Sequence, residues 1–123
     1  MTDTCLILLA HGSPDPRWRA PFESLAEAIK REQGASKVKL AYMEFSSPSL
    51  ADAAGEARRE GFTILRLLPL FMAAGAHVER DIPARAEALR RDFPELTVEI
   101  LPAVGEHPRM RAALQEIARE SLL

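Results

Sequence analysis

Four short apolar segments alternate with longer segments in which apolar residues recur every three or four positions. The apolar segments cover residues 5–10, 37–43, 62–68 and 96–101. Continuous apolar runs of this length are typical of strands that are covered on both faces, and the first segment is the most continuous. The second segment alternates polar and apolar residues at its start, which predicts a strand nearer the edge of a sheet.

The segments between the strands predict helices, which we expect over residues 17–33, 48–60, 84–93 and 109–122. Gly34 is a suitable stop for the first helix. Ser46 or Ser47 is the predicted cap of the second, with Pro48 in its first turn. The last helix carries one apolar face, made of Met110, Leu114 and Ile117.

Strand and helix therefore alternate four times along the chain. With right-handed crossovers, this order predicts an α/β fold: a four-stranded parallel sheet with helices on both faces. The natural strand order is 2-1-3-4, which places the first and third strands side by side. Because parallel strands end at the same edge, residues that follow these strands are expected to meet at one rim.

Three side chains that can bind metals follow strands of this sheet. His11 ends the first strand and precedes Gly12. Glu44 follows the second strand. His77 lies in a loop of small residues after the third, just before a helix entry that we expect over residues 79–83. The sequence therefore predicts two imidazoles and a carboxylate along one rim of the sheet.

Composition narrows the class of protein. The chain has 123 residues, nearly half of them apolar, which predicts one domain over residues 1–123. Its net charge of −2, with both signs mixed, disfavours a nucleic-acid binder. Cys5 is the only cysteine, so no disulfide within the chain is expected, and a reducing cytoplasm is the expected location. The apolar run 5–10 is too short to span a membrane.

Several phrases together resemble a known family. They are His11-Gly12-Ser13 with Asp15-Pro16, Glu44 with Pro48-Ser49-Leu50, Pro69-Leu70-Phe71 with Gly75, His77 and Asp81-Ile82-Pro83, and Val104-Gly105. In these phrases the chain resembles the short-form sirohydrochlorin chelatases of the CbiX and SirB type, within the class II chelatases. The phrase around His77 is the most specific of them, and the resemblance covers almost the whole chain.

The resemblance implies an enzyme that inserts a divalent metal into the tetrapyrrole sirohydrochlorin without ATP, in cobalamin or siroheme biosynthesis. It also implies a flavodoxin-like parallel sheet. The two histidines of the family fall on His11 and His77, and its acidic residue falls on Glu44. The metal (Co²⁺, Fe²⁺ or Ni²⁺) would be a substrate, and no prosthetic group is expected.

The chemistry of metal insertion suits these residue types. Neutral imidazole binds first-row divalent metals and accepts protons near neutral pH. A site without thiolate holds the metal moderately, which suits transfer rather than storage. The substrate of the family carries many carboxylates, so arginines are expected near the cleft. The candidate substrate residues are Arg17, Arg19, Arg80, Phe71, Met72 and Gly75.

Other interpretations remain open at this stage. The same ligands would serve a protein that binds metal or tetrapyrrole without turnover. A histidine phosphatase also has a histidine and glycine after its first strand, but it needs an arginine before the histidine, where this chain has Ala10. Each histidine could instead be structural, Glu44 could be a solvated turn residue, and His107 is expected to be a bystander. Because one domain offers one wall of a cleft, a homodimer is expected.

Overall fold

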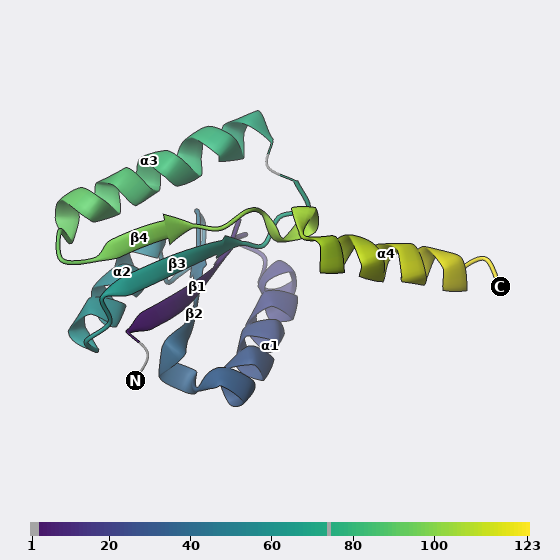
Figure 1. Cartoon of the computed structure of the whole chain (residues 1–123), viewed down its shortest axis with the longest axis horizontal. Helices are drawn as coiled ribbons and strands as arrows, with labels where there is room; N and C mark the ends of the chain where they lie inside the picture. Colours follow the sequence, from purple (N-terminus) through teal and green to yellow (C-terminus); the bar gives the residue numbers. More distant parts are fainter. Residues whose placement is uncertain (1–2, 74) are drawn as a thin grey trace.

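The computed structural model describes residues 3–73 and 75–123, with the backbone alone for residues 76–79. Within these residues, strands and helices alternate as the sequence predicts (Figure 1). The elements are β1 (Thr4–Ala10), α1 (Pro16–Gln33), η1 (Ala35–Lys37), β2 (Val38–Tyr42), α2 (Leu50–Arg59), β3 (Ile64–Pro69), α3 (Ala76–Asp92), β4 (Thr97–Ile100), η2 (Val104–Glu106) and α4 (Pro108–Glu120).

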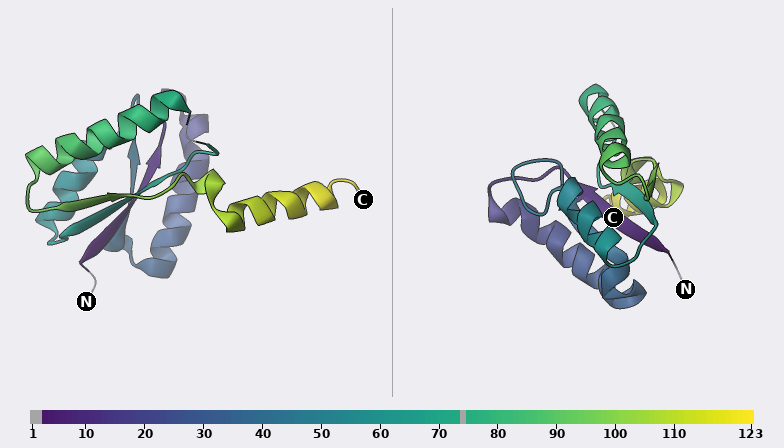
Figure 2. Two further views of the ribbon diagram at one scale, coloured as in Figure 1. Left: turned by 45° about the horizontal axis from the view of Figure 1, so that its top comes forward. Right: turned by 90° about the vertical axis from the view of Figure 1, so that its left-hand side faces the viewer.

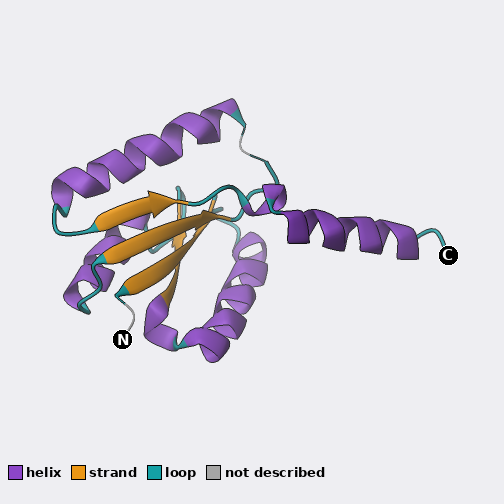
Figure 3. Ribbon diagram, in the orientation of Figure 1, coloured by secondary structure: helices purple, strands orange, loops and turns teal. Residues whose placement is uncertain are grey.

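The four strands form one parallel sheet in the order β2-β1-β3-β4, which confirms the predicted order. The strand β1 is central, and β2 lies at an edge, as its alternating pattern indicates. The last residues of neighbouring strands are in register: Ala10 pairs with Tyr42, and Leu9 pairs with Pro69. The carboxyl ends of β1, β2 and β3 therefore meet at one rim (Figure 3).

The two faces of the sheet bury cores of different size. On the α2/α3 face, sixteen buried residues form one cluster, which joins strand residues such as Ile7 and Leu67 to Ala54 of α2 and Ala86 of α3. On the α1 face, the buried cluster contains three residues, Leu8, Ala26 and Val38. Two helices cover one face and a single helix covers the other, so the sheet is covered unequally.

The helix α4 leaves the body of the protein. Figures 1 and 2 show it projecting beyond the carboxyl ends of the strands, away from the other helices. No residue of α4 is buried, and Leu114 and Ile117 of its predicted apolar face are 41% and 57% exposed. The predicted helix is confirmed, but its apolar face does not pack on the sheet.

The cap predicted for α2 is wrong. Ser49, rather than Ser46 or Ser47, caps the helix, and Pro48 lies before it rather than in its first turn. The Ser49 hydroxyl accepts a hydrogen bond from the N–H of Asp52, and the Asp52 carboxylate accepts one from the N–H of Ser49. This reciprocal pair satisfies two free backbone donors, which a cap at Ser46 or Ser47 could not do.

The start predicted for α3 is also wrong. The helix begins at Ala76, three residues before the entry expected over residues 79–83, and Pro83 lies inside it. The buried stripe of the helix explains the earlier start, since Ile82, Ala86 and Leu89 are spaced by four and three residues and all enter the core. As a result, the backbone of His77 belongs to the first helical turn and not to a loop.

Candidate metal and substrate site

His11 and Glu44 come together at the carboxyl rim of the sheet. His11 is the first residue after β1, and Glu44 is the second after β2. The Nε2 atom of His11 lies 3.2 Å from Oε1 of Glu44, and their side chains are 54% and 45% exposed. Two of the three predicted ligands therefore form a pair that solvent can reach.

Backbone hydrogen bonds fix the relative position of this pair. The N–H of Met43 donates to the carbonyl of Ala10 over 2.9 Å, and the N–H of Glu44 donates to the carbonyl of His11 over 3.0 Å. The first of these bonds is the last of the β1–β2 ladder, and the second joins the two loops just beyond the strands. His11 and Glu44 are thus held beside each other by backbone hydrogen bonds.

A serine adds a second connection between the two loops. The Ser46 hydroxyl donates to the carbonyl of Ser13 over 2.8 Å and accepts from the N–H of Ser13 over 3.2 Å. We call this two-way contact the Ser13–Ser46 clasp. It joins the loop that carries His11 to the loop that carries Glu44, and no sequence pattern predicts it.

Gly12 allows the two loops to approach closely. Its φ of +98° lies in the region that favours glycine, and a Cβ at this position would lie 1.9 Å from the carbonyl oxygen of Glu44. In the opposite loop, Phe45 has a φ of +66°, a rare conformation for a bulky residue. Strained residues of this kind gather at functional sites, where surrounding contacts maintain them.

The geometry of the pair suits a shared cation. The Nδ1 atom of His11 lies 3.2 Å from the carbonyl oxygen of Gly12, so a proton on Nδ1 can be donated to that oxygen. The Nε2 lone pair then faces the Glu44 carboxylate, and the two repel each other. A proton or a metal ion between them removes this repulsion. Two ligand bonds of about 2.1 Å that meet at about 100° separate the donor atoms by about 3.2 Å.

A hollow of about 370 Å³ lies beside His11. Its walls come from the rim and from α1, and they are mostly apolar. The lining residues are His11, Gly12, Ser13, Trp18, Arg19, Phe22, Tyr42, Leu70 and Phe71. The Trp18 ring is 69% exposed at this hollow, so an aromatic surface is available to a flat ligand.

The predicted ligand His77 cannot be placed with the other two. Its backbone lies in the first turn of α3, after the N-cap Gly75, but its side chain lies outside the described residues. In the part of the chain that is described, no group of three His, Cys, Asp or Glu side chains is arranged to hold a metal ion. The described site thus consists of the His11–Glu44 pair.

The predicted substrate arginines differ in what they contact. The Arg17 guanidinium pairs with Asp15 at 2.7 Å and is largely exposed. This hydrogen bond lowers the pKa of the Asp15 carboxyl. Arg19 donates to the carbonyl of Ser13 over 3.0 Å and lines the hollow. Arg80 is exposed on α3. Of the three arginines, Arg19 therefore both lines the hollow and donates a hydrogen bond to the loop that carries His11.

The other predicted substrate residues surround the segment after β3. Phe71 is half-buried, packs against the larger core and lines the hollow. Met72 is 57% exposed. Gly75 has a φ of −71°, which any residue can adopt, so it makes no unusual turn, and its contact with substrate stays a prediction.

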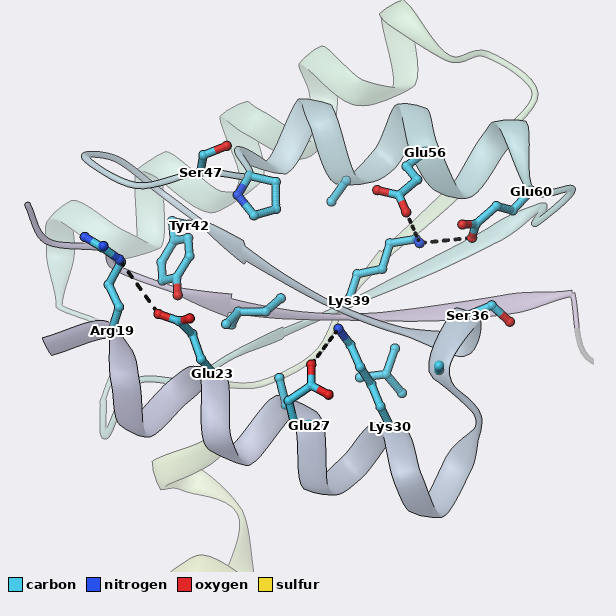
Figure 4. Close-up of a pocket in the computed structure, with 16 residues that line it drawn as sticks. Arg19, Glu23, Glu27, Lys30, Ser36, Lys39, Tyr42, Ser47, Glu56 and Glu60 are labelled. Atoms are coloured by element: carbon cyan, nitrogen blue, oxygen red, sulfur yellow. Dashed lines mark hydrogen bonds and ion pairs between the residues drawn. The ribbon is translucent and has the colours of Figure 1, made fainter. Parts of the chain in front are cut away.

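A second, larger hollow of about 690 Å³ lies between α1 and α2, over the edge strand β2 (Figure 4). Its carboxylates are already paired with cations: Lys39 contacts both Glu56 at 3.1 Å and Glu60 at 2.9 Å. Burial lowers the pKa of Lys39, but the hydrogen bonds to Glu60 and Glu56 outweigh burial and raise it overall. Among the described residues, this hollow therefore offers no imidazole–carboxylate pair like His11 and Glu44.

The remaining candidate residues have structural roles. The Nδ1 of His107 accepts a hydrogen bond from the N–H of Arg109, so His107 caps α4, as its bystander role predicts. Cys5 is fully buried, and burial raises the pKa of its thiol to about 11.

None of the helices in the described residues is both long and apolar enough to cross a lipid bilayer.

Sequence reasoning missed two groups at the site. Ser46 and Phe45 carry no pattern that separates them from ordinary loop residues, because their roles depend on contacts between two loops. Phe22 and Leu70 line the hollow and fit the general helix and strand patterns. A glycine directly after a candidate ligand, as at Gly12, is the one signal that could have indicated a close approach.

The chain is similar to known proteins over most of its length. The CbiX family profile matches residues 5–121. A sirohydrochlorin cobaltochelatase of Methanocaldococcus jannaschii is 36% identical over 78 residues, which cover 63% of this chain and 54% of that protein. The match therefore spans about half the length of this curated relative.

Solved structures share the fold. A CbiX protein of Marinobacter aquaeolei superposes with a TM-score of 0.87 at 36% identity, over 97% of this chain and 94% of the other. The sirohydrochlorin chelatase SirB of Bacillus subtilis subspecies spizizenii, solved in complex with cobalt, superposes with a TM-score of 0.82 at 18% identity. That match covers 98% of this chain and 51% of SirB.

Proposed function

Because the chain belongs to the CbiX family, we propose that it is a sirohydrochlorin chelatase, which inserts Co²⁺ or Fe²⁺ into the tetrapyrrole without ATP. The observation that carries this proposal is the His11–Glu44 pair, whose donor atoms lie 3.2 Å apart beside an aromatic hollow. The name of the Methanocaldococcus relative supports the substrate, and cobalt in SirB supports the metal.

In this proposal, His11 and Glu44 hold the incoming metal ion while it loses water. One imidazole nitrogen and one carboxylate oxygen give a divalent first-row metal two protein ligands, and His77 supplies a second imidazole. The half-exposed side chains leave the remaining coordination positions open to water and then to the nitrogens of the substrate. Such a partly filled site allows transfer, since no closed ligand shell has to be dismantled.

The reaction also releases two protons. The metal ion replaces the two N–H protons of the macrocycle, so each turnover leaves a metallated tetrapyrrole and two protons. Once the metal has moved to the substrate, the Nε2 of His11 is free to accept one of them. Glu44 stabilises the resulting imidazolium through the same 3.2 Å contact, and solvent removes the proton from the exposed pair.

The hollow beside His11 accounts for binding of the macrocycle. Its apolar wall, with Trp18, Phe22 and Phe71, suits one face of a flat ring system. The carboxylates at the periphery of sirohydrochlorin require cations, for which Arg19 lies in the wall, and Arg17 and Arg80 are further candidates. Met72 is the exposed apolar neighbour of this wall.

We propose that the active form is a homodimer in the cytoplasm. One copy presents one wall to a ring that has two faces, and a second copy supplies the other wall. The single cysteine is a free thiol, which suits a reducing compartment. Sedimentation at micromolar concentration is expected to give the mass of two chains, whereas a single-chain mass at full activity would refute the dimer.

The test of the proposed function is turnover with substrate in excess. Sirohydrochlorin at tenfold molar excess over protein, mixed with Co²⁺, should be metallated completely, as followed by its visible spectrum. His11→Ala and Glu44→Ala should each slow insertion strongly, and His107→Ala should not, with circular dichroism as the folding control. Metallation that stops at one equivalent of protein would instead identify a binding protein.

A further inference from the structure

The hydroxyl of Tyr42 is buried without a hydrogen-bond partner in the chain. Tyr42 is the last residue of β2 and is 2% exposed. Among the buried side-chain oxygen and nitrogen atoms of the described residues, this hydroxyl alone lacks a partner. Phenylalanine would fill the same space without an unpaired polar atom, and an unpaired buried donor is unfavourable. A buried tyrosine at this position therefore indicates a partner from outside the chain.

Tyr42 lies where the two hollows meet. Of the described residues, only Tyr42 and Arg19 line both the small hollow beside His11 and the larger hollow between α1 and α2. Figure 4 shows the hydroxyl of Tyr42 pointing from β2 toward Glu23 of α1. The hydroxyl is thus aimed into the larger hollow, at its border with the small one.

The surroundings keep this hydroxyl protonated. Burial raises the pKa of Tyr42, the nearby Glu23 carboxylate raises it further, and the Arg19 guanidinium lowers it, with a net increase above the ordinary value. At neutral pH the phenol is therefore a hydrogen-bond donor. A donor next to a guanidinium suits an anionic acceptor, which both groups can bind at once.

Arg19 keeps donors for such an acceptor. Its Nη1 donates to the carbonyl of Ser13 over 3.0 Å. Its Nε lies 3.8 Å from Oε1 of Glu23, which is too long for a hydrogen bond, and the Glu23 side chain is 58% exposed. Glu23 thus lies near both groups without a hydrogen bond to either, so another carboxylate can take its place.

We infer that Tyr42 and Arg19 together bind one peripheral carboxylate of the tetrapyrrole, which displaces the side chain of Glu23. The carboxylate accepts one hydrogen bond from the phenol and one from the guanidinium. The flat body of the macrocycle lies in the apolar hollow beside His11, and its carboxylate arm reaches the junction of the two hollows. Because Arg19 also holds the loop that carries His11, the arm positions the ring relative to the metal-binding pair.

This inference rests on the proposed function for its ligand, and the same chemistry would accept a free carboxylic acid. The two hollows are continuous at Tyr42, which favours the arm of a larger ligand whose apolar body the small hollow accepts. A free dicarboxylate such as succinate has no apolar body of this kind. Succinate, followed by isothermal titration, is therefore the comparison ligand in the test.

Binding of sirohydrochlorin is measured without metal, through the fluorescence of Trp18. Trp18 is the only tryptophan and lines the small hollow, so a bound macrocycle should quench it. Tyr42→Phe removes the hydroxyl alone and should raise the dissociation constant of sirohydrochlorin about 10-fold or more, since a bond to a carboxylate is charge-assisted. The melting temperature should not fall and the affinity for Co²⁺ should not change, because the lost hydroxyl has no partner in the chain.

Glu23→Gln tests the displacement. Removal of the competing charge should lower the dissociation constant of sirohydrochlorin about threefold or more. Glu27→Gln is the matched control, because Glu27 lies one turn further along α1, lines the same hollow and pairs with Lys30 at 3.4 Å. The same loss of charge there should change the dissociation constant by less than about twofold.

Four results would overturn the inference. An unchanged dissociation constant in Tyr42→Phe would remove the subsite and leave the proposed function intact. Equal effects of Glu23→Gln and Glu27→Gln would mean that net charge alone matters. Succinate that binds with a dependence on Tyr42, while sirohydrochlorin binds without it, would identify a site for a free acid. No binding of sirohydrochlorin to the unmodified protein would refute both this inference and the proposed function.

Discussion

The loops after β1 and β2 and the helix α4 differ in what determines their position. The loops are fixed from within the chain, by backbone hydrogen bonds between them and by the Ser13–Ser46 clasp. Among the described residues, α4 contacts mainly the η2 turn at its base, and Leu114 and Ile117 of its apolar stripe stay exposed. Contacts within the chain thus hold the first region in place, whereas α4 projects from the body.

This difference bears on the proposed function. A metal-holding pair must be placed within a fraction of an ångström, which short local hydrogen bonds achieve. Under that proposal, substitutions in the two loops should change metal binding, and substitutions on the exposed stripe of α4 should leave metal binding by the single chain unchanged.

The largest effect is expected from Gly12→Ala. The added Cβ meets the carbonyl of Glu44 and the φ of +98° disfavours alanine, so the two loops must move apart. Displacements of this size reduce rates by about 100-fold. The matched control is Gly61→Ala, at a φ of +94° with nothing within 4 Å, which should cost about 1–2 kcal/mol of unfolding free energy and leave insertion intact. Equal insertion rates for the two variants would contradict the close approach.

A smaller effect is expected from Ser46→Ala, which removes both hydrogen bonds of the clasp. Residues that orient ligands typically change metal affinity by about 10- to 100-fold, and a value near the lower limit is expected because the backbone ladder remains. Isothermal titration with Co²⁺ measures the change. Ser46→Thr keeps the hydroxyl and should restore binding, and Ser47→Ala is the neighbouring control. Unchanged affinity in Ser46→Ala would show that the ladder alone positions the pair.

Hydrogen exchange should separate the two regions without any substitution. The amides of α4 should exchange faster than the N–H groups of Met43 and Glu44, because no described residue of α4 is buried. Protection of α4 equal to that of Met43 and Glu44 would mean that another surface stabilises the helix.

The smallest effect concerns pH. The pKa of Asp15 is lowered in the folded state by its hydrogen bonds to Arg17. Its contribution to stability is therefore present above the unfolded pKa, about 3.9, and is lost as the pH falls through the lower folded value. Asp15→Asn retains a capping side chain, and its melting temperature should fall less steeply below pH 4 than that of the unmodified protein. A steeper decrease in the variant would contradict the sign of this shift.

Much of the fold could be predicted because local patterns determine it. The strands and their order follow from apolar periodicity and alternation. The helix entry expected over residues 79–83 was placed too late, because Pro83 favours a first turn, whereas Ile82 is buried in a helix that begins at Ala76. The unpacked state of α4 was also missed, because an amphipathic pattern shows that a helix will be covered but not by what.

The site was predictable in part. His11 and Glu44 meet as expected because they follow neighbouring strands by one and two residues and a backbone hydrogen bond joins them. The side chain of His77 lies outside the described residues, so its role as a ligand stays a prediction. The Ser13–Ser46 clasp joins residues 33 positions apart in a geometry that no local pattern encodes.

The most direct test of the central claim is to determine which histidine binds the metal. The protein labelled with ¹⁵N in its histidine side chains is titrated with paramagnetic Co²⁺ at pH 8. The account predicts that the ring signals of His11 broaden first, that those of His107 persist, and that Glu44→Gln raises the cobalt concentration required by about 10-fold. His11 signals that remain unchanged at one equivalent of Co²⁺ would contradict the account.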